Sequence, residues 1–127
     1  MDTNNNPLRV LLVEDDALVM RTTKDILQRL GYSVLPADSA REALAICSAD
    51  NERIDLVMTD MVMDEMNGIE LRDQLLSVRP DIKVLFTSGH TYDTLAQELS
   101  LEPDEHFIHK PFTLKELTQK IRAAVAD

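Results

Sequence analysis

The sequence predicts an α/β fold, a doubly wound parallel sheet of five strands with five helices distributed over both faces. Three observations lead to this prediction. Five short, mostly apolar runs alternate with five segments whose apolar residues recur at helical spacing. The first run is almost continuously apolar, as a strand buried on both faces requires. Capping signals separate the two kinds of segment. Such alternation is typical of βαβ units with parallel strands.

The first part of the chain supplies two strands and two helices. Residues 8–13, LRVLLV, form the first strand, and residues 17–30 form a helix that Gly31 ends at a C-cap position. Residues 33–37 are the second strand. Residues 39–42 form a capping box, and the helix behind it carries an apolar stripe made of Ala40, Ala43, Leu44 and Cys47.

The middle of the chain repeats this pattern. Residues 54–59 are predicted to be the third strand, and residues 83–87 the fourth. Between them, residues 68–78 have helical spacing. Because proline disfavours a helical conformation in the residue before it, this helix is expected to end before Pro80.

The last part completes the sheet. Residues 91–99 form a weaker helix, and residues 106–109 are a short fifth strand. Residues 113–116 are a second capping box. It opens a final helix with one apolar face, made of Leu114, Leu117, Ile121 and Ala124.

Length and composition indicate one folded domain. The chain has 127 residues, of which 44% are hydrophobic and 28% charged, as is typical of globular proteins. Residues 1–7, MDTNNNP, are polar and lack periodicity. We therefore expect a disordered arm or linker remnant at residues 1–7 and a single domain over residues 8–127.

Charge and cysteine content narrow the class of protein. There are 13 basic and 23 acidic residues, a net charge of −10. Since an acidic chain repels nucleic-acid phosphates and anionic lipids, direct nucleic-acid binding is not expected. Membrane insertion is not expected either, because no apolar run approaches the ~20 residues of a span. One cysteine, Cys47, excludes an intrachain disulfide and fits a cytoplasmic location.

Chemically active side chains stand at the predicted strand ends. Ligands of doubly wound sheets bind at the carboxyl ends of the strands. The residues found there are Glu14, Asp15 and Asp16 after the first strand, Asp60 after the third, Thr87 and Ser88 at the fourth, and Lys110 after the fifth. These side chains are therefore expected to meet at one edge of the sheet.

The carboxylates indicate a metal site. Two carboxylates about 4 Å apart repel by roughly 4 kcal/mol at an effective dielectric of 20, so several of them need a cation or protons. Oxygen ligands in an open site suit Mg²⁺ or Mn²⁺. A carboxylate beside the metal is able to become an aspartyl phosphate, with Lys110 and a hydroxyl holding the phosphoryl oxygens. Asp16 is interpreted as a helix N-cap, with a place in the site as the alternative.

Four motifs support this interpretation through a resemblance. They are LLVEDD at residues 11–16, DLVMTDMVM and NG within residues 55–68, VLFTSG at 84–89 and HKPF at 109–112. With them, residues 8 to about 125 resemble the receiver domain of two-component response regulators. The resemblance implies the flavodoxin-like strand order 2-1-3-4-5. It also implies a phosphoprotein switch in a phosphorelay.

The resemblance also implies residue roles around the metal. Asp60 would be the phosphoacceptor and a magnesium ligand. Asp15 would bind the metal directly, and Glu14 would act mainly through water. The backbone carbonyl of Val62 would be a further ligand, whatever its side chain.

Other residues would form the conformational switch. Ser88 would be the switch hydroxyl, because the family places a small residue after it, with Thr87 as the alternative one position earlier. Lys110 would hold the phosphoryl group, and its bond to Pro111 is often cis in this family. Phe107 stands at the position of the family's switch aromatic.

The chain departs from the family pattern at two positions, and a third residue stands close to the site. Asp64 replaces a common proline, so we expect extra negative charge near the metal and a more mobile loop. Val62 cannot hydrogen-bond an attacking water through its side chain, so slow loss of the phosphoryl group is our hypothesis. His90, two residues after Ser88, is a candidate to bond water or stack over the phosphoryl group.

Partners follow from the resemblance as well. A histidine kinase or a histidine phosphotransfer protein would donate the phosphoryl group. A downstream protein would bind the face made by the helix at 91–99, the strand at 106–109 and the helix that follows, in a monomer or weak dimer. The chain is interpreted as a stand-alone regulator or as the receiver of a larger protein. TSGHT and HKPFT favour the tail of a hybrid histidine kinase.

Two alternatives compete with a phosphoacceptor switch. One is a degenerate receiver that binds proteins without taking up phosphate. The other is a magnesium-dependent phosphatase of the haloacid-dehalogenase type. Such enzymes have a second aspartate at the position where this chain has Val62. The favoured interpretation is not an enzyme. It allows at most self-phosphorylation from small donors and slow self-dephosphorylation.

Overall fold

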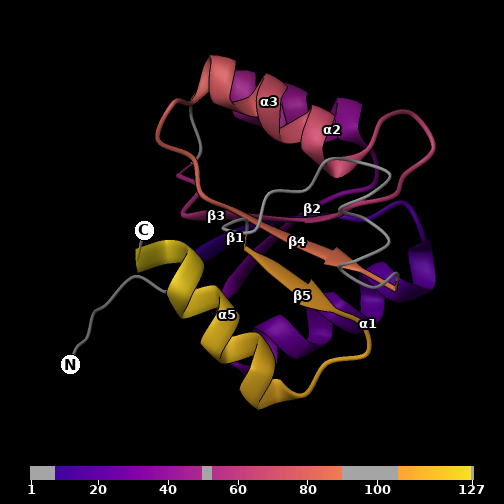
Figure 1. Ribbon diagram of the computed structural model, residues 1–127, viewed down its shortest axis with the longest axis vertical. Coiled ribbons are helices and arrows are strands. Elements are labelled where there is room, and N and C mark those ends of the chain that lie inside the picture. Colours follow the sequence, from indigo (N-terminus) through magenta and orange to yellow (C-terminus); the bar gives the residue numbers. More distant parts are fainter. Residues whose placement is uncertain (1–7, 50–52, 90–105, 127) are drawn as a thin grey trace.

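One parallel sheet forms the centre of the structure (Figure 1). The structure is a computed structural model that describes residues 8–49, 53–89 and 106–126. The sheet order is β2-β1-β3-β4-β5, and each neighbouring pair is parallel. The strands are β1 (Arg9–Val13), β2 (Ser33–Ala37), β3 (Leu56–Asp60), β4 (Val84–Ser88) and β5 (Phe107–His109). The predicted fold class and strand order are thus confirmed.

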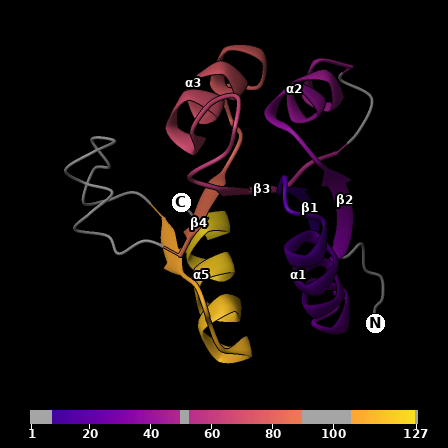
Figure 2. The ribbon, with the colours of Figure 1, turned by 90° about the vertical axis from the view of Figure 1, so that its right-hand side faces the viewer.

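Helices cover both faces of the sheet (Figure 2). On one face lie α1 (Ala17–Arg29) and α5 (Leu114–Ala126), and on the other lie α2 (Ala40–Ala49) and α3 (Gly68–Val78). The helix predicted at residues 91–99 lies outside the described residues, as do His90 and the arm at residues 1–7. No helix in the described ranges combines the length and the apolar character needed to cross a membrane.

The continuous apolar run of β1 is explained by its position between two helical layers. Val10 and Leu12 belong to the core beneath α1 and α5, whereas Leu11 and Val13 belong to the core beneath α2 and α3. All four side chains are buried. Because successive side chains of a strand point to opposite faces, a strand buried on both sides needs apolar residues at every position.

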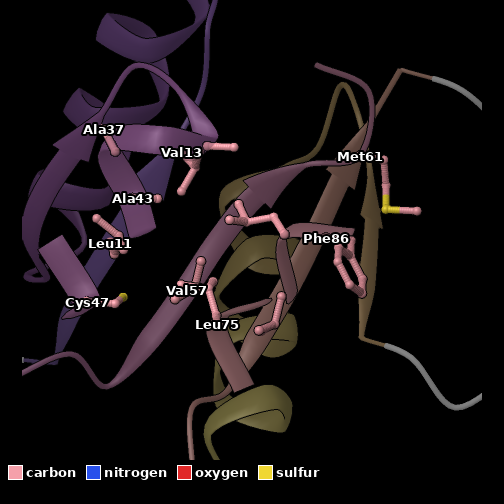
Figure 3. Packing of buried hydrophobic residues seen from close by; sticks show 12 residues of the cluster. Leu11, Val13, Ala37, Ala43, Cys47, Val57, Met61, Leu75 and Phe86 are labelled. Carbon is pink, nitrogen blue, oxygen red and sulfur yellow. The ribbon is translucent and has the colours of Figure 1, made fainter. Parts of the chain in front are cut away.

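The core beneath α2 and α3 packs against Phe86 of β4 (Figure 3). Leu11 and Val57 reach it from the strands, Cys47 from α2 and Leu75 from α3, and each is at most 1% exposed. Each large apolar side chain buried in this way contributes about 1.5–3 kcal/mol relative to exposure. This packing fixes the strands whose ends carry the predicted site.

Two of the predicted helix boundaries are confirmed in detail. Gly31 adopts a φ of 95°, the left-handed conformation that ends α1, and its N–H donates to Gln28 O at 3.0 Å. At α5, the Glu116 N–H donates to Thr113 Oγ1 at 3.0 Å, and the Thr113 N–H donates to Glu116 Oε1 at 2.8 Å. The capping box expected at residues 113–116 is therefore complete.

The cap of α2 differs in one bond from the prediction, and the cap of α3 was not predicted. The Glu42 N–H donates to Ser39 Oγ at 3.0 Å as expected, but Glu42 Oε1 accepts the N–H of Asp38, at 2.7 Å, so the return bond reaches one residue further back. A capping box that sequence reasoning missed starts α3. There Asn67 Oδ1 accepts the Glu70 N–H at 2.8 Å, and Glu70 Oε1 accepts the Asn67 N–H at 2.9 Å.

The third and fourth strands begin and end slightly later than predicted. The ladder between them reaches Asp60, which lies beside Thr87. Asp55 stands before the ladder, where its carboxylate accepts the Arg9 N–H at 2.8 Å. Asp60 and Ser88 are therefore the last residues of β3 and β4, so the sheet itself holds both of them.

Candidate functional site

The carboxyl ends of four strands meet at one edge of the sheet, as predicted. Val13 lies beside Thr59, so the residues that follow β1 stand next to the end of β3. Ser88 lies beside His109, which brings the end of β4 next to the loop that follows β5. The Lys110 N–H donates to Ser88 O at 2.8 Å and fixes that loop to the sheet.

Three acidic side chains gather at this edge. Carboxylate oxygens of Glu14, Asp15 and Asp60 all lie within 4.8 Å of one another. Glu14 is buried, Asp60 is half-buried and Asp15 is exposed. The group therefore opens toward solvent on the Asp15 side while its other members are held in the protein.

Lys110 supplies the positive charge of the site. Its Nζ lies 3.2 Å from Glu14 Oε1 and 3.5 Å from Asp60 Oδ2. Its peptide bond to Pro111 is cis, as the resemblance implied. The fold thus brings together four charged side chains from the ends of three strands, namely Glu14, Asp15, Asp60 and Lys110.

Burial changes the proton affinity of Glu14. Removal from water raises the pKa of its carboxyl above the ordinary value, and the nearby charge of Asp60 acts in the same direction. The Asp16 N–H, 3.2 Å from Glu14 Oε2, and the Lys110 ammonium oppose this rise without cancelling it. A second cation at the site would favour the ionised form of Glu14.

Asp16 has the role of a helix cap. Its Oδ1 accepts the N–H groups of Leu18 at 2.9 Å and Val19 at 3.1 Å, at the start of α1. Asp16 is absent from the group of close carboxylates found among the described residues. The interpretation of Asp16 as an N-cap is therefore confirmed, and its alternative place among the metal ligands is not supported.

The two candidate hydroxyls differ in their surroundings. Thr87 Oγ1 donates to Thr59 O at 3.5 Å, so this hydroxyl is used within the sheet. Ser88 is 1% exposed and occupies the last position of β4. Successive strand residues point to opposite faces, so the two side chains are expected on different faces of the sheet. Phe107, the candidate switch aromatic, is half-buried against the core that contains Phe86.

The loop between β3 and α3 passes over the carboxylates. The Val62 N–H donates to Asp60 Oδ1 at 3.4 Å, and the Asp64 N–H donates to Asp15 Oδ2 at 3.3 Å. The Val62 side chain is 49% exposed. The bond from Asp64 to Asp15 was not foreseen, because sequence spacing does not show where a backbone amide points.

Gly68 allows α3 to start close to this loop. A Cβ at this position would lie 3.0 Å from Asp60 O and 3.2 Å from Met61 Cα. The Gly68 N–H donates to Met61 O at 2.7 Å. Because Gly68 has no side chain, the start of α3 can lie close to the backbone of Asp60. The NG dipeptide alone does not indicate this role.

The donor set fits a magnesium ion. Its three side chains offer only oxygen atoms, and hard divalent cations prefer such ligands. The exposed position of Asp15 leaves room for the waters that magnesium retains. Lys110 stands on the Glu14 and Asp60 side, where it neutralises part of the carboxylate charge.

Comparison with known proteins shows the family of the chain. Residues 10–122 match the family described as the response regulator receiver domain. The sensor kinase CckA of Brucella abortus is 40% identical over 113 residues, which are 89% of this chain and 12% of the kinase. The response regulator receiver protein CpdR of that organism is 34% identical over 113 residues, 89% of this chain and 92% of CpdR.

A solved structure gives the same result for the fold. The crystal structure of a response regulator receiver domain protein from Clostridium thermocellum aligns with a TM-score of 0.81 at 27% identity and covers 94% of each chain. The match over residues 10–122 includes β2 to β5, β1 from its second residue onward, and the acidic edge of the sheet. From its sequence, its fold and these relatives, the chain belongs to the family of response regulator receiver domains.

Proposed function

We propose that the chain is a phosphoacceptor switch of a two-component system. In this proposal Asp60 takes a phosphoryl group from a histidine kinase or a histidine phosphotransfer protein, in a magnesium-dependent reaction. Residues around Ser88 and Phe107 then change the surface formed by β5, α5 and the helix that the sequence predicts at 91–99. The protein acts in the cytoplasm, as a switch and not as a dedicated enzyme.

One observation carries this proposal. Lys110 Nζ lies 3.2 Å from Glu14 Oε1 and 3.5 Å from Asp60 Oδ2, and oxygens of Glu14, Asp15 and Asp60 lie within 4.8 Å of one another. A protein that only used this surface for binding would have no need to concentrate three carboxylates and an ammonium. The arrangement suits an anionic phosphoryl group held between a metal and a lysine.

The transfer uses a carboxylate oxygen of Asp60 as the nucleophile. In the proposed step, a carboxylate oxygen of Asp60 forms a bond to phosphorus while the phosphorus–nitrogen bond of the phosphohistidine breaks. The released imidazole takes a proton from solvent. A magnesium ion held by Glu14, Asp15, Asp60 and the Val62 carbonyl would supply positive charge to the phosphoryl oxygens. Lys110 would supply the second positive charge, as a point charge.

Phosphorylation would bias two conformations of the domain. Shifting a population from 1:99 to 99:1 needs ~5.5 kcal/mol of differential stabilisation. A hydrogen bond to a charged group contributes ~1.5–3 kcal/mol, so the contacts of Ser88 and Lys110 with the phosphoryl group supply a large part of this energy. An incomplete shift is therefore expected in the isolated domain, and a bound partner would complete it.

An apolar cavity beside Lys110 supports a protein donor. It has a volume of about 320 Å³ and is lined by Leu18, Val19, Thr22, Thr23, Ile26, Lys110, Pro111 and Phe112. Leu18 is 69% exposed. Lys110 lines this cavity and lies 3.5 Å from Asp60 Oδ2, so a protein that brings a phosphohistidine to Asp60 would lie close to the cavity. Leu18→Glu should slow transfer from a protein donor but not from acetyl phosphate.

The first experiment tests phosphoryl uptake itself. The domain is incubated with Mg²⁺ and acetyl phosphate, and its intact mass is measured beside Asp60→Asn. Asp81→Asn, changed at an exposed position between α3 and β4, is the matched control. We expect one phosphoryl adduct in the parent and in the Asp81 variant. None should form in the Asp60 variant or without metal.

That experiment, repeated with a phosphorylated transfer protein and with a small phosphate ester, separates the competing functions. Absence of an adduct with acetyl phosphate and with a phosphorylated transfer protein would favour a binding module that takes up no phosphate. Repeated turnover of a small phosphate ester would favour a phosphatase. A single stable adduct contradicts both alternatives and directs the search to the cognate kinase.

A further inference from the structure

We propose that the backbone amide of Asp64 positions the Asp15 carboxylate for magnesium, which makes Asp64 a positioning residue of the metal site. This inference rests on the proposed function, because it assumes that Asp15 binds the metal. It concerns the N–H of Asp64 and not its side chain. The observation that carries it is a hydrogen bond of 3.3 Å from Asp64 N to Asp15 Oδ2, between residues 49 positions apart.

Asp15 needs such a partner more than the other two carboxylates do. Glu14 is buried and contacts both the Asp16 N–H and Lys110 Nζ. Asp60 contacts Lys110 Nζ and the Val62 N–H. Asp15 is exposed, and among the described residues the Asp64 amide is the donor that reaches its carboxylate. In the described part of the structure, that bond is therefore the hydrogen bond that orients the Asp15 carboxylate.

The Asp64 amide is itself held in place. At one side of the loop the Gly68 N–H donates to Met61 O at 2.7 Å, which closes the turn before α3. On the other side Arg41 Nη2 lies 3.4 Å from Glu65 Oε2, which joins α2 to the residue next to Asp64. One backbone hydrogen bond and one exposed ion pair thus restrain the loop that carries this amide.

A carboxylate can serve both the amide and the metal. One oxygen of Asp15 accepts the Asp64 N–H, and a carboxylate has a second oxygen for a cation. A backbone donor of this kind fixes the direction of the ligand and adds no charge. The Asp64 side chain has a separate influence, since it lines a cavity of about 260 Å³ together with Asp15 and adds negative charge there.

The residue type at position 64 decides whether this bond exists. Proline, common at this position in the resembling family, has no N–H and cannot donate. Any other residue keeps the donor. Two substitutions therefore separate the backbone from the charge, because Asp64→Ala removes the carboxylate and keeps the amide, whereas Asp64→Pro removes both.

The experiment measures magnesium affinity by calorimetry for the parent, Asp64→Ala and Asp64→Pro. Removal of an outer partner of a metal ligand costs about 10–100-fold in affinity, and the exposed 3.3 Å bond should lie at the lower end. We expect the dissociation constant of Asp64→Pro to be about tenfold above that of Asp64→Ala. Equal constants for these two variants would overturn the inference while leaving the proposed function intact. A parent that binds no magnesium would overturn both.

A second measurement does not depend on the folding of the proline variant. Amide hydrogen exchange of Asp64 is compared in the metal-free parent and in Asp15→Ala, which lacks the acceptor. We expect the Asp64 amide to exchange faster in Asp15→Ala. The Gly68 amide, bonded to Met61 O, should keep its protection in both. An Asp64 amide that exchanges at the same rate in both proteins contradicts the inference.

Discussion

Lys110 Nζ lies 3.2 Å from Glu14 Oε1 and so joins the end of the last strand to the end of the first, across 96 positions of sequence. The Glu14 side chain is 5% exposed and that of Lys110 is 25% exposed. Charges this far removed from water need partners, because an isolated buried carboxylate is strongly disfavoured. The pair therefore links the stability of the sheet edge to the charge state of the candidate site.

Loss of Lys110 should destabilise the metal-free protein. Breaking a fully buried ion pair costs about 3–5 kcal/mol, and the partial exposure of Lys110 reduces this to roughly 1–3 kcal/mol for Lys110→Met. Urea unfolding in the presence of a chelator measures the change, with Lys115→Met at an exposed position as the control. The double variant with Glu14→Gln should recover most of the loss. Equal stability of the two single lysine variants would refute this role of Lys110.

The raised pKa of Glu14 predicts a particular pH dependence. Burial raises this pKa in the folded protein above its ordinary value, so the folded state binds the proton more tightly than the unfolded state. The stabilising effect of protonation is present at acid pH and is lost as the pH rises through the folded pKa. Glu14→Gln mimics the protonated form, so it should gain stability relative to the metal-free parent as the pH rises.

Thermal unfolding between about pH 4 and pH 7, in a chelator, measures this difference. The melting temperature of Glu14→Gln minus that of the parent should increase as the pH rises from the acid end and level off above the folded pKa of Glu14. Magnesium should narrow the difference, because a bound cation favours the ionised carboxylate of the parent. A difference that stays constant with pH would contradict the prediction.

Two glycines near the site should respond differently to alanine. In Gly68→Ala the new Cβ would lie 3.0 Å from Asp60 O and 3.2 Å from Met61 Cα, so the backbone beside the phosphoacceptor must move. A steric insertion of this kind costs about 1–3 kcal/mol. Gly89 has nothing within 4 Å of an added Cβ, so Gly89→Ala is the matched control for stability. Chemical denaturation should show a loss for the first variant only.

Most of the fold could be predicted from the sequence because its pattern of apolar residues is compatible with one arrangement of strands and helices. The apolar residues at 10–13 have no polar face, and only a strand between two helical layers accommodates them. Two helix boundaries were also predicted correctly, at the capping box of 113–116 and at Gly31. These caps depend on neighbouring residues alone, so the local sequence is enough to predict them. The start of α3 at Gly68 was predicted, but its capping box was missed because an asparagine cap is not in the Ser or Thr form of the box.

The site was predictable as a set of strand ends but not in its details. Parallel strands bring their carboxyl ends together, so the meeting of Asp15, Asp60 and Lys110 follows from topology. The bond between the Asp64 N–H and Asp15 depends on the path of a loop, which no residue pattern encodes. The contact of the Thr87 hydroxyl with Thr59 O likewise follows from the packing of the strands and not from any residue pattern.

Substitutions of the adjacent residues Asp15 and Asp16 should have different effects, on magnesium affinity for Asp15 and on stability for Asp16. Asp16→Ala removes the cap of α1 and should cost about 1 kcal/mol of stability, with little change in magnesium affinity. Asp15→Asn should leave α1 intact and abolish most of the magnesium binding. Denaturation and calorimetry on both variants provide the comparison. Loss of magnesium binding in Asp16→Ala as large as in Asp15→Asn would show that Asp16 belongs to the site.

The lifetime of the phosphoryl group should depend on Val62. This side chain is 49% exposed, and its N–H donates to Asp60 Oδ1 at 3.4 Å, so it stands next to the proposed phosphoacceptor. Hydrolysis needs a water directed at phosphorus, and valine offers that water no hydrogen bond. Val62→Asn provides a carbonyl and an amide group, which should orient the water and shorten the lifetime several-fold.

Decay of the adduct after removal of acetyl phosphate, followed by intact mass, measures this lifetime. Leu76→Asn, at an exposed apolar position of α3, controls for the introduction of a polar group. Since Val62 is expected to bind the metal through its backbone carbonyl, magnesium affinity should stay nearly unchanged in Val62→Asn. A shorter lifetime at unchanged affinity therefore points to the attacking water. An unchanged lifetime would mean that access of water, rather than its orientation, limits hydrolysis.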